Sequence, residues 1–183
     1  MVAAVLLAAG DGSRFEGEMH KLLSQLRGRT IIERAVDSAA ASGLALYVVT
    51  GAVDLDAVLP PSVTVVRNEH WQDGQAVSVR AGITAAAADG HDAVVVGLGD
   101  QPFVPATAWR AVAATDGSIV VATYDGERGN PVKLSASVWP LLPVTGDEVG
   151  RAVMRSRPDL VVPVPCDGDA SDIDTLEDLH RWT

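Results

Sequence analysis

An unbroken apolar run at the amino terminus, Val2 to Ala9, constrains the fold more than any other stretch of the sequence. Such a run, with no polar alternation, is typical of a strand buried on both faces of a parallel sheet. It ends abruptly in the segment GDGSR, residues 10–14. A glycine-rich turn after a buried strand leaves backbone N–H groups free of side-chain bulk, a common way to bind phosphate. This turn is therefore a candidate phosphate site, with Arg14 and Lys21 as mobile positive charges.

Two familiar phosphate-binding loops do not fit this turn. The dinucleotide fingerprint requires a third glycine where Phe15 stands, and no Gly-Lys-Ser/Thr follows for a P-loop. From these residues alone, a plain strand-to-helix turn with a solvated arginine and lysine stays an open alternative. Basic residues are nevertheless concentrated in this early segment, namely Arg14, Lys21, Arg27, Arg29 and Arg34. A solvated basic face is the alternative interpretation of that cluster.

Length and charge limit the classes of protein to consider. A chain of 183 residues suits one domain with a substantial core, and 48% hydrophobic with 21% charged residues is an ordinary globular balance. The formal net charge of −10 argues against a nucleic-acid surface. The single cysteine, Cys166, cannot form an internal disulfide, and no apolar run is long enough to span a membrane. We expect a soluble, cytoplasmic protein with neither a nucleic-acid nor a membrane partner.

Apolar strand patterns alternate with helical patterns along the chain. Strands are predicted at 45–50, 63–67, 93–98, 119–124, 131–134 and 160–164, and helices at 30–42, 53–59, 75–88, 105–114, 135–142, 149–156 and 175–182. Thr30 and Glu33 form a capping-box pattern, and Gly43 is placed to end that helix. This alternation predicts a three-layer α/β/α Rossmann-like sandwich with a mainly parallel twisted sheet. No linker divides residues 1–183, although the pattern loosens after residue 125, so 126–183 is expected to cover the ligand edge.

Carboxylates follow two segments that this fold would bring to its ligand edge. Asp100 comes just after the buried strand at 93–98, within GLGDQPFV. Asp172 and Asp174 alternate in DASDIDTLEDL, so on an extended segment both point to the same side. Mg²⁺ commonly takes one or two carboxylates together with substrate phosphates. Alternatively, Asp100 is a turn residue, and Asp174 or Thr175 caps the last helix.

LAAGDGSR followed by HKLL resembles the opening signature of the MobA-like NTP transferase family. Four later segments follow in family order: NEHWQDGQAVSVRAG, GDQP, ERGNPVK with TGDEVGR, and the late acidic segment. The resemblance implies a nucleotide-diphospho-sugar transferase-like fold, with residues 1–125 binding nucleotide and 126–183 completing the acceptor and metal sites. LAAG in place of LAGG is similar to the molybdenum cofactor cytidylyltransferase branch, and so favours CTP over GTP.

The resemblance also implies roles for individual residues. Lys21, Arg14 and Asp100 would be catalytic, and Asp100 with Asp174, or less favourably Asp172, would hold Mg²⁺. Nucleotide binding is expected of Leu7, Ala8, Ala9, Gly10, Gly12, Ser13, Arg14, Lys21, Asn68, Gly74, Ser78 and Asp100. Acceptor binding is expected of Gln101, Pro102, Arg128, Gly129, Asn130, Pro131, Asp147 and Arg151.

Plainer structural roles are open for several of these residues. Gly74 can simply start a helix, Ser78 can be a surface hydroxyl and Trp71 can pack, while RGNP can be a tight turn. The chain also departs from the family pattern at three places. His20 precedes Lys21 where Pro or Asn is usual, Glu16 and Glu18 add negative charge nearby, and Val149 extends TGDEVGR so that the register of Arg151 shifts.

The function that the resemblance implies is a Mg²⁺-dependent nucleotidyltransferase. It would move a nucleoside monophosphate from an NTP, with CTP favoured, to a phosphorylated acceptor such as molybdopterin, and it would release pyrophosphate. A molybdoenzyme is the expected recipient of the product. Three alternatives stay open: an enzyme acting on a sugar phosphate or other phosphorylated metabolite, a non-catalytic nucleotide- or pterin-binding delivery factor, and an α/β interaction domain.

Overall fold

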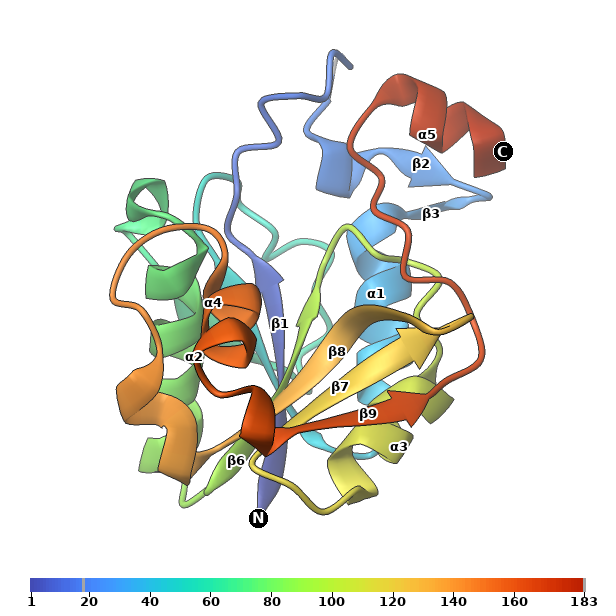
Figure 1. Ribbon diagram of the computed structural model, residues 1–183. Helices are drawn as coiled ribbons and strands as arrows, with labels where there is room; N and C mark the ends of the chain where they lie inside the picture. The colour runs from blue at the N-terminus through green and yellow to red at the C-terminus, as the bar shows by residue number, and fades with distance from the viewer. Residues whose placement is uncertain (18, 183) are drawn as a thin grey trace.

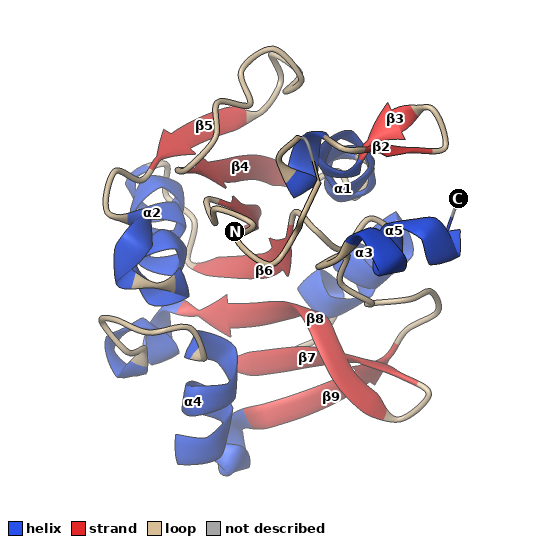
Figure 2. Cartoon of the chain, turned by 90° about the horizontal axis from the view of Figure 1, so that it is seen from above, coloured by secondary structure: helices blue, strands red, loops and turns tan. Residues whose placement is uncertain are grey.

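One mostly parallel sheet lies between two layers of helices. The computed structural model describes residues 1–17 and 19–182. Within them, seven strands form a sheet in the order β5-β4-β1-β6-β8-β7-β9. Helices α1 and α3 cover one face of the sheet, and α2 and α4 cover the other (Figures 1 and 2). The predicted three-layer α/β/α fold is therefore confirmed.

The bounds of the elements follow the predicted alternation closely. The strands are β1 (Val2–Ala8), β2 (Gln25–Leu26), β3 (Arg29–Thr30), β4 (Ala45–Thr50), β5 (Thr64–Arg67), β6 (Ala93–Leu98), β7 (Ile119–Tyr124), β8 (Glu127–Ser135) and β9 (Val161–Pro165). The α-helices are α1 (Ile31–Ala40), α2 (Gln75–Ala88), α3 (Ala106–Ala114), α4 (Val149–Ser156) and α5 (Leu176–Trp182). Short 3₁₀ turns span Lys21–Leu23, Trp71–Asp73, Ala136–Leu141 and Pro158–Leu160.

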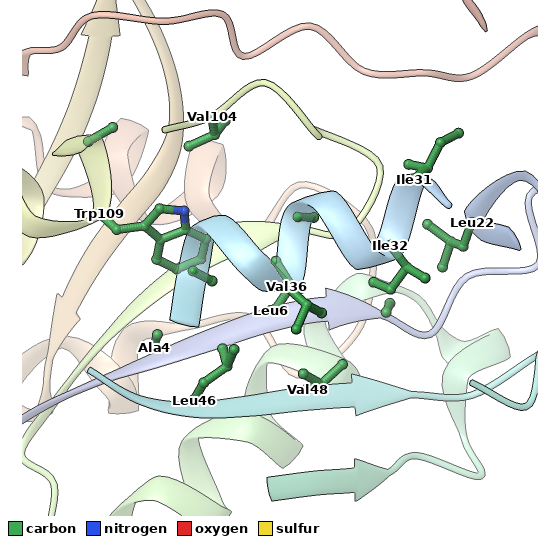
Figure 3. Packing of buried hydrophobic residues seen from close by; sticks show 14 of the residues in the cluster. Ala4, Leu6, Leu22, Ile31, Ile32, Val36, Leu46, Val48, Val104 and Trp109 are labelled. Atoms are coloured by element: carbon green, nitrogen blue, oxygen red, sulfur yellow. The ribbon is translucent and has the colours of Figure 1, made fainter. Parts of the chain in front are cut away.

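Strand β1 supplies side chains to both cores, as a strand covered on two faces must. Ala4 and Leu6 point toward α1, where they pack with Ile32 and Val36 (Figure 3). The alternating residues of β1, such as Val5, join the second core beneath α2 and α4. Full burial of each large aliphatic side chain contributes about 1.5–3 kcal/mol. The amino-terminal strand is thus anchored on both sides, which gives the loop after it a fixed starting point.

Local sequence signals explain where α1 begins. The Thr30 hydroxyl accepts a hydrogen bond from the Glu33 N–H at 3.3 Å, and a Glu33 carboxylate oxygen accepts from the Thr30 N–H at 2.7 Å. This is the predicted capping box. Gly43, with φ of +83°, lies just beyond the end of the helix, where a positive φ favours glycine.

Several predicted elements need correction. Residues 53–59 form a turn and no helix, because the Asp54 carboxylate accepts from the Asp56 N–H and two prolines follow at positions 60 and 61. Strand β8 starts at Glu127, earlier than predicted, because it pairs with β7 in an antiparallel hairpin. Pro105 is the residue before α3 and not its first turn. The small β2–β3 hairpin was not predicted.

The carboxyl ends of β1, β4 and β6 form the edge that matters for function. Leu7 of β1 lies opposite Val49 of β4 and Leu98 of β6, in parallel register. The Gly99 N–H donates to the Leu7 carbonyl at 2.8 Å, which ties the loop after β6 to the end of β1. From β9 the chain runs back past this edge to α5, beside β2 and β3 (Figure 1). Segments from both ends of the sequence therefore meet here.

No helix in the described part of the chain has both the length and the apolar character that crossing a membrane requires.

Candidate active site

The glycine-rich segment after β1 forms a tight loop held by its own residues. The Ser13 N–H donates to the Asp11 carboxylate at 3.1 Å, and the Phe15 N–H donates to the Gly12 carbonyl at 2.8 Å. Gly12 has a φ of +64°, and a Cβ there would lie 3.1 Å from Lys21 Cγ. Glycine at this position therefore gives the turn its conformation and also lets the lysine pass close to it.

His20 fastens this loop to the 3₁₀ turn that carries Lys21. Its Nδ1 accepts from the Leu22 N–H at 3.2 Å, which leaves Nε2 as the protonated nitrogen that donates to the Gly10 carbonyl at 3.1 Å. Burial lowers the pKa of His20 below its usual 6.5, although the Gly10 carbonyl opposes this shift. The neutral imidazole is thus the form that suits the loop.

Lys21 extends into the space between two aspartates from distant segments. Its Nζ lies 2.7 Å from Asp100 Oδ2 and 2.8 Å from Asp174 Oδ1, and its side chain is only 12% exposed. Burial lowers the pKa of Lys21, but Asp100 and Asp174 more than offset this, so the net shift is upward. Arg14, which is largely exposed, reaches the other oxygen of Asp174 at 2.9 Å. Two cations therefore face two carboxylates at the mouth of the loop.

The late acidic segment is held in place by the residue between its two aspartates. Ile173 is fully buried, and its N–H donates to the Asp100 carbonyl at 3.0 Å. Asp174 points to Lys21, whereas Asp172 accepts from Gln101 Nε2 at 2.6 Å. Burial and the neighbouring charge of Asp100 raise the pKa of Asp172. The extended arrangement expected for 172–174 thus brings the carboxylates of Asp172 and Asp174 toward Asp100. The two carboxylates nevertheless bind different side chains.

Helix α5 has its own cap, which leaves Asp174 free for the site. The Asp178 N–H donates to the Thr175 hydroxyl at 3.1 Å, and the Asp178 carboxylate accepts from the Thr175 N–H at 3.0 Å. Thr175 therefore carries the capping role for which Asp174 was the alternative.

A cleft of about 1400 Å³ runs from the glycine loop across the sheet edge to α4. The predicted site residues that line it are Leu7, Ala8, Ala9, Gly10, Gly12, Ser13, Arg14, Lys21, Gly74, Ser78, Asp100, Gln101, Arg128, Gly129, Asn130, Asp147, Arg151, Asp172 and Asp174. The structure thus gathers residues from six separate sequence segments around one space. A cleft of this size can hold two substrates side by side.

Other predicted residues lie away from this cleft. Asn68 is 5% exposed, and its Nδ2 donates to Ser78 Oγ at 2.9 Å, so this pair is a buried link between β5 and α2. Pro102 is buried beside Gln101, and Pro131 lines a separate small void with Asn130. Lys133, the last residue of the ERGNPVK segment, donates to the Ala113 carbonyl at the end of α3. A role for Asn68, Pro102 or Pro131 through direct ligand contact stays a prediction.

The early basic cluster divides into two groups. Arg14 and Lys21 line the cleft, but Arg27, Arg29 and Arg34 do not. Arg29 pairs with Asp37, Arg34 donates to the Leu26 carbonyl at 2.7 Å, and Arg27 donates to the Trp182 carbonyl at 2.8 Å. Arg27 thus links the β2–β3 hairpin to α5, whereas Arg29 and Arg34 link the hairpin to α1. Glu16 is exposed and does not line the cleft, and Glu18 is outside the described residues.

Sequence reasoning missed several residues at the α4 end of the cleft. Tyr124, Met154 and Arg155 line it, and the Tyr124 hydroxyl donates to the Asn130 carbonyl at 2.7 Å. Burial raises the pKa of Tyr124, so this hydroxyl stays protonated. Glu148 pairs with Arg155 at 2.9 Å and with Arg151 at 3.7 Å. The spacing of Arg151 and Arg155, one helical turn apart on α4, was a signal that could have indicated a shared basic face.

The donor set at the mouth of the loop suits a hard divalent cation that arrives with phosphate. In the described chain, no group of three or more His, Cys, Asp or Glu side chains is arranged to hold a metal ion. Asp100 and Asp174 nevertheless both contact the same amine, so their oxygens can also meet a common cation. Mg²⁺ typically takes only one or two carboxylates and fills its octahedron with phosphate oxygens and water. Two aspartates beside a phosphate-type loop meet that requirement.

The strand order, with a parallel half joined to an antiparallel hairpin, and the charged cleft at the carboxyl edge define a protein of the nucleotidyltransferase class. A nucleotidyl transferase from Methanothermobacter superimposes with a TM-score of 0.79 and 27% identity, covering 99% of this chain and 95% of its own. The chain belongs to the MobA-like NTP transferase domain family, whose model matches residues 4–162. The resemblance seen in the sequence is thus confirmed.

Three further proteins show the range of relatives. Rv0371c from Mycobacterium tuberculosis H37Rv has a TM-score of 0.84 and 28% identity over 99% of this chain and 96% of its own, and a manganese complex of Rv0371c gives 0.80. Nicotine blue oxidoreductase from Paenarthrobacter nicotinovorans is 33% identical over 98% of this chain and 95% of its own length. Bifunctional protein GlmU from Mycolicibacterium gilvum is 26% identical, and the alignment covers 93% of this chain and 33% of that protein.

Proposed function

We propose that this enzyme transfers a cytidylyl group from CTP to a phosphorylated acceptor, with molybdopterin as the favoured acceptor, and releases pyrophosphate. The observation that carries the proposal is the meeting of Lys21 Nζ with Asp100 and Asp174, at 2.7 and 2.8 Å, directly beside the glycine loop. A mobile cation and two carboxylates at that point are what a bound triphosphate and its metal require.

The nucleotide half of the cleft supplies binding and positive charge. In the proposed complex the loop from Ala9 to Ser13 surrounds the phosphates, and Arg14 pairs with the leaving pyrophosphate. Lys21 turns from the carboxylates to the reacting phosphate, so its charge follows the charge that develops there. Asp100 and Asp174 would hold Mg²⁺, which when bound neutralises phosphate oxygens and favours departure of the pyrophosphate.

The chemical step needs no nucleophile from the protein. A phosphate oxygen of the acceptor attacks the α-phosphorus of CTP, the new P–O bond forms in line, and the bond to the β-phosphate oxygen breaks with its electron pair. The acceptor phosphate is already ionised at neutral pH, so no general base is required. Catalysis then consists of holding two anions in line and offsetting their charge, which is the chemistry that Lys21 and Arg14 offer.

The acceptor half would recognise a second anion. Arg128 on β8 and Arg151 on α4 line this end of the cleft and are exposed enough to reach a ligand. Gln101, Gly129, Asn130 and Asp147 complete the surface there. A pterin phosphate would place its phosphate toward the nucleotide and its ring against this side. Transfer of the finished product to a molybdoenzyme is the proposed next step.

The test is a matrix of nucleotides against acceptors, read as pyrophosphate release. CTP, GTP, ATP and UTP are each incubated with Mg²⁺ and with molybdopterin, N-acetylglucosamine 1-phosphate or no acceptor. The proposal requires pyrophosphate only when CTP and molybdopterin are present together. Release with the sugar phosphate would show that the acceptor is a sugar phosphate and not molybdopterin. Binding of CTP with no release in any combination would indicate a non-catalytic carrier.

A second candidate comes from the relative named nicotine blue oxidoreductase, which is 33% identical over nearly the whole chain. A redox role would need a bound electron donor, and a reduced nicotinamide dinucleotide is the common one. The loop argues against it, because Phe15 fills the position of the third glycine and is itself buried. The matching control assay follows the oxidation of NADPH in the presence of a dye acceptor.

A further inference from the structure

The loop at residues 145–148, before α4, is fastened to the amino-terminal end of α2. The Gly146 carbonyl accepts from the Ala76 N–H at 2.9 Å, and the Gly146 N–H donates to the Asp73 carbonyl at 3.3 Å. The Asp147 carboxylate accepts from the Gln75 N–H at 3.0 Å. Two hydrogen bonds therefore join this loop to α2, and a third joins it to the 3₁₀ turn at Trp71–Asp73 just before that helix.

Gly74 makes this close approach possible. Its φ is +103°, and a Cβ on it would lie 2.8–2.9 Å from backbone atoms of Gly146. Any other residue at position 74 would be strained in its own backbone and would push the 145–148 loop away. The glycine that starts α2 is thus also the glycine against which this loop packs.

The contact leaves little of the α2 end free for a ligand. The first two N–H groups of the helix, from Gln75 and Ala76, already have partners in the loop. The Asp147 carboxylate also places a negative charge at the positive end of the helix dipole, which is stabilising. In this structure these two N–H groups of α2 therefore bind the 145–148 loop of the same chain.

The same loop fixes the start of α4. Val149, the first residue of α4, is 2% exposed and packs in the core beneath α2 and α4. Arg151 follows two residues later and lines the cleft with a largely exposed side chain. Between the bond at Asp147 and the buried Val149, the chain has little freedom. The place at which α4 presents Arg151 to the cleft thus depends on how the loop is fastened.

We propose that Asp147 is a positioning residue for the acceptor: by fastening the 145–148 loop to α2, it holds Arg151 over the acceptor half of the cleft. The assignment of that half rests on the proposed function. In this proposal Asp147 acts through the loop and not on the reacting atoms. Its effect is on where the acceptor's anionic group binds, and it also links α2, on the nucleotide side, to α4, on the acceptor side.

The experiment compares the wild-type protein with Asp147→Ala, Asp147→Asn and the control Asp116→Ala. Asp116 is an exposed aspartate that does not line the cleft. Amide exchange of Gln75 and Ala76 is measured by NMR in the free protein. Binding of inorganic phosphate is measured from the Arg151 side-chain Nε–H signal, with and without CTP. Neither readout depends on turnover, so a failed transfer assay would leave this test intact.

We expect Asp147→Ala to speed exchange at both amides about tenfold and to weaken phosphate binding at Arg151 about tenfold. Asp147→Asn keeps an oxygen that can accept from the Gln75 N–H, so it should restore most of both properties. Asp116→Ala should match the wild type. With molybdopterin as acceptor, Asp147→Ala should raise the KM for acceptor and leave the KM for CTP within about twofold.

Two results would overturn the proposal. One is exchange at Gln75 and Ala76 in Asp147→Ala that equals the wild type. The other is phosphate binding at Arg151 that is absent in the wild type or equal in the wild type and Asp147→Ala. If Asp147→Ala does not fold, Gly74→Ala replaces it as the variant that displaces the loop, and the same two readouts and the same expected directions apply.

Discussion

Lys21 and Asp174 stand 153 residues apart in the sequence, yet Lys21 Nζ donates to Asp174 Oδ1 at 2.8 Å. The same amine donates to Asp100 Oδ2 at 2.7 Å, so one side chain connects the loop after β1, the loop after β6 and the segment before α5. Lys21 stays protonated across the neutral range, because the two carboxylates raise its pKa more than burial lowers it. The three segments are therefore held together by charge before any ligand binds.

Replacement of Lys21 should abolish most activity. Lys21→Met keeps the length of the aliphatic chain and removes the amine that is proposed to follow the reacting phosphate. We expect turnover to fall about 10²-fold or more, the scale of losing one preorganised charge contact. Lys21→Arg is the matched control, because it keeps the charge with a different geometry, and it should retain more activity. The turnover of both variants is measured as pyrophosphate release from CTP. Equal activity in Lys21→Met and the wild type would exclude a catalytic role for Lys21.

Asp174 and Asp172 should differ in their importance although they are two residues apart. Asp174 shares Lys21 with Asp100, whereas Asp172 is bound to Gln101 and has a raised pKa. Asp174→Asn should lower turnover about 10²-fold, and Asp172→Asn should lower it less than about tenfold. The two variants are compared at saturating Mg²⁺ and CTP. The reverse order would move the metal site to Asp172.

Gly12 offers a test of how closely the loop must approach Lys21. Gly12→Ala would place a Cβ 3.1 Å from Lys21 Cγ in a backbone with φ of +64°. Gly28→Ala is the matched control, since Gly28 has φ of +79° and open space around it. Both variants should lose about 1 kcal/mol of stability from backbone strain. Only Gly12→Ala should also weaken CTP binding, measured by calorimetry. Equal CTP affinities of Gly12→Ala and Gly28→Ala would show that this loop does not bind the nucleotide.

The hydrogen bonds of His20 predict a pH dependence of stability. Because burial lowers its pKa in the folded state, the unfolded chain takes up the proton first as the pH falls below about 6.5. The contribution of neutral His20 is therefore full above that pH and is lost as the pH falls through the folded-state pKa. Thermal unfolding from pH 7.5 to 5.5 should show a larger drop in Tm for the wild type than for His20→Asn, about 2–4 °C for each kcal/mol lost.

If Tm falls with pH equally in the wild type and in His20→Asn, the proposed contribution of neutral His20 to stability is contradicted. His20→Asn is a suitable comparison because asparagine can accept from the Leu22 N–H without titrating. Asp11 and Lys21 also face His20, and both remain in the variant, so their own effects on the curves cancel.

The sheet and most helices could be predicted because their signals are local. The apolar run of β1, the capping box at Thr30 and the strands at 45–50 and 93–98 each depend on neighbours in the sequence. The turn at 53–59 was mistaken for a helix because Asp54 and the following prolines compete with a weak helical pattern. The two prolines of β9 are tolerated because the strand lies at the sheet edge and pairs only with β7.

Most residues that line the cleft could be named from the sequence, but the partners of their side chains could not. Asp100 and Asp174 could be named from their segments, but their common contact with Lys21 depends on the docking of Ile173, which no local pattern shows. Asn68 and Ser78 form a buried pair because β5 and α2 pack together, again a matter of tertiary structure. The bond from Gln75 to Asp147 spans 72 residues and leaves no trace in either segment.

The most direct test of the central claim is a titration of Mn²⁺ into the protein with CTP, followed by electron paramagnetic resonance. Mn²⁺ reports on the Mg²⁺ site because both prefer carboxylate and phosphate oxygens. The proposal predicts one tightly bound ion in the wild type, and affinity weakened at least about tenfold in both Asp100→Asn and Asp174→Asn. Undiminished affinity in both variants would contradict the claim that these two aspartates hold the metal beside the nucleotide.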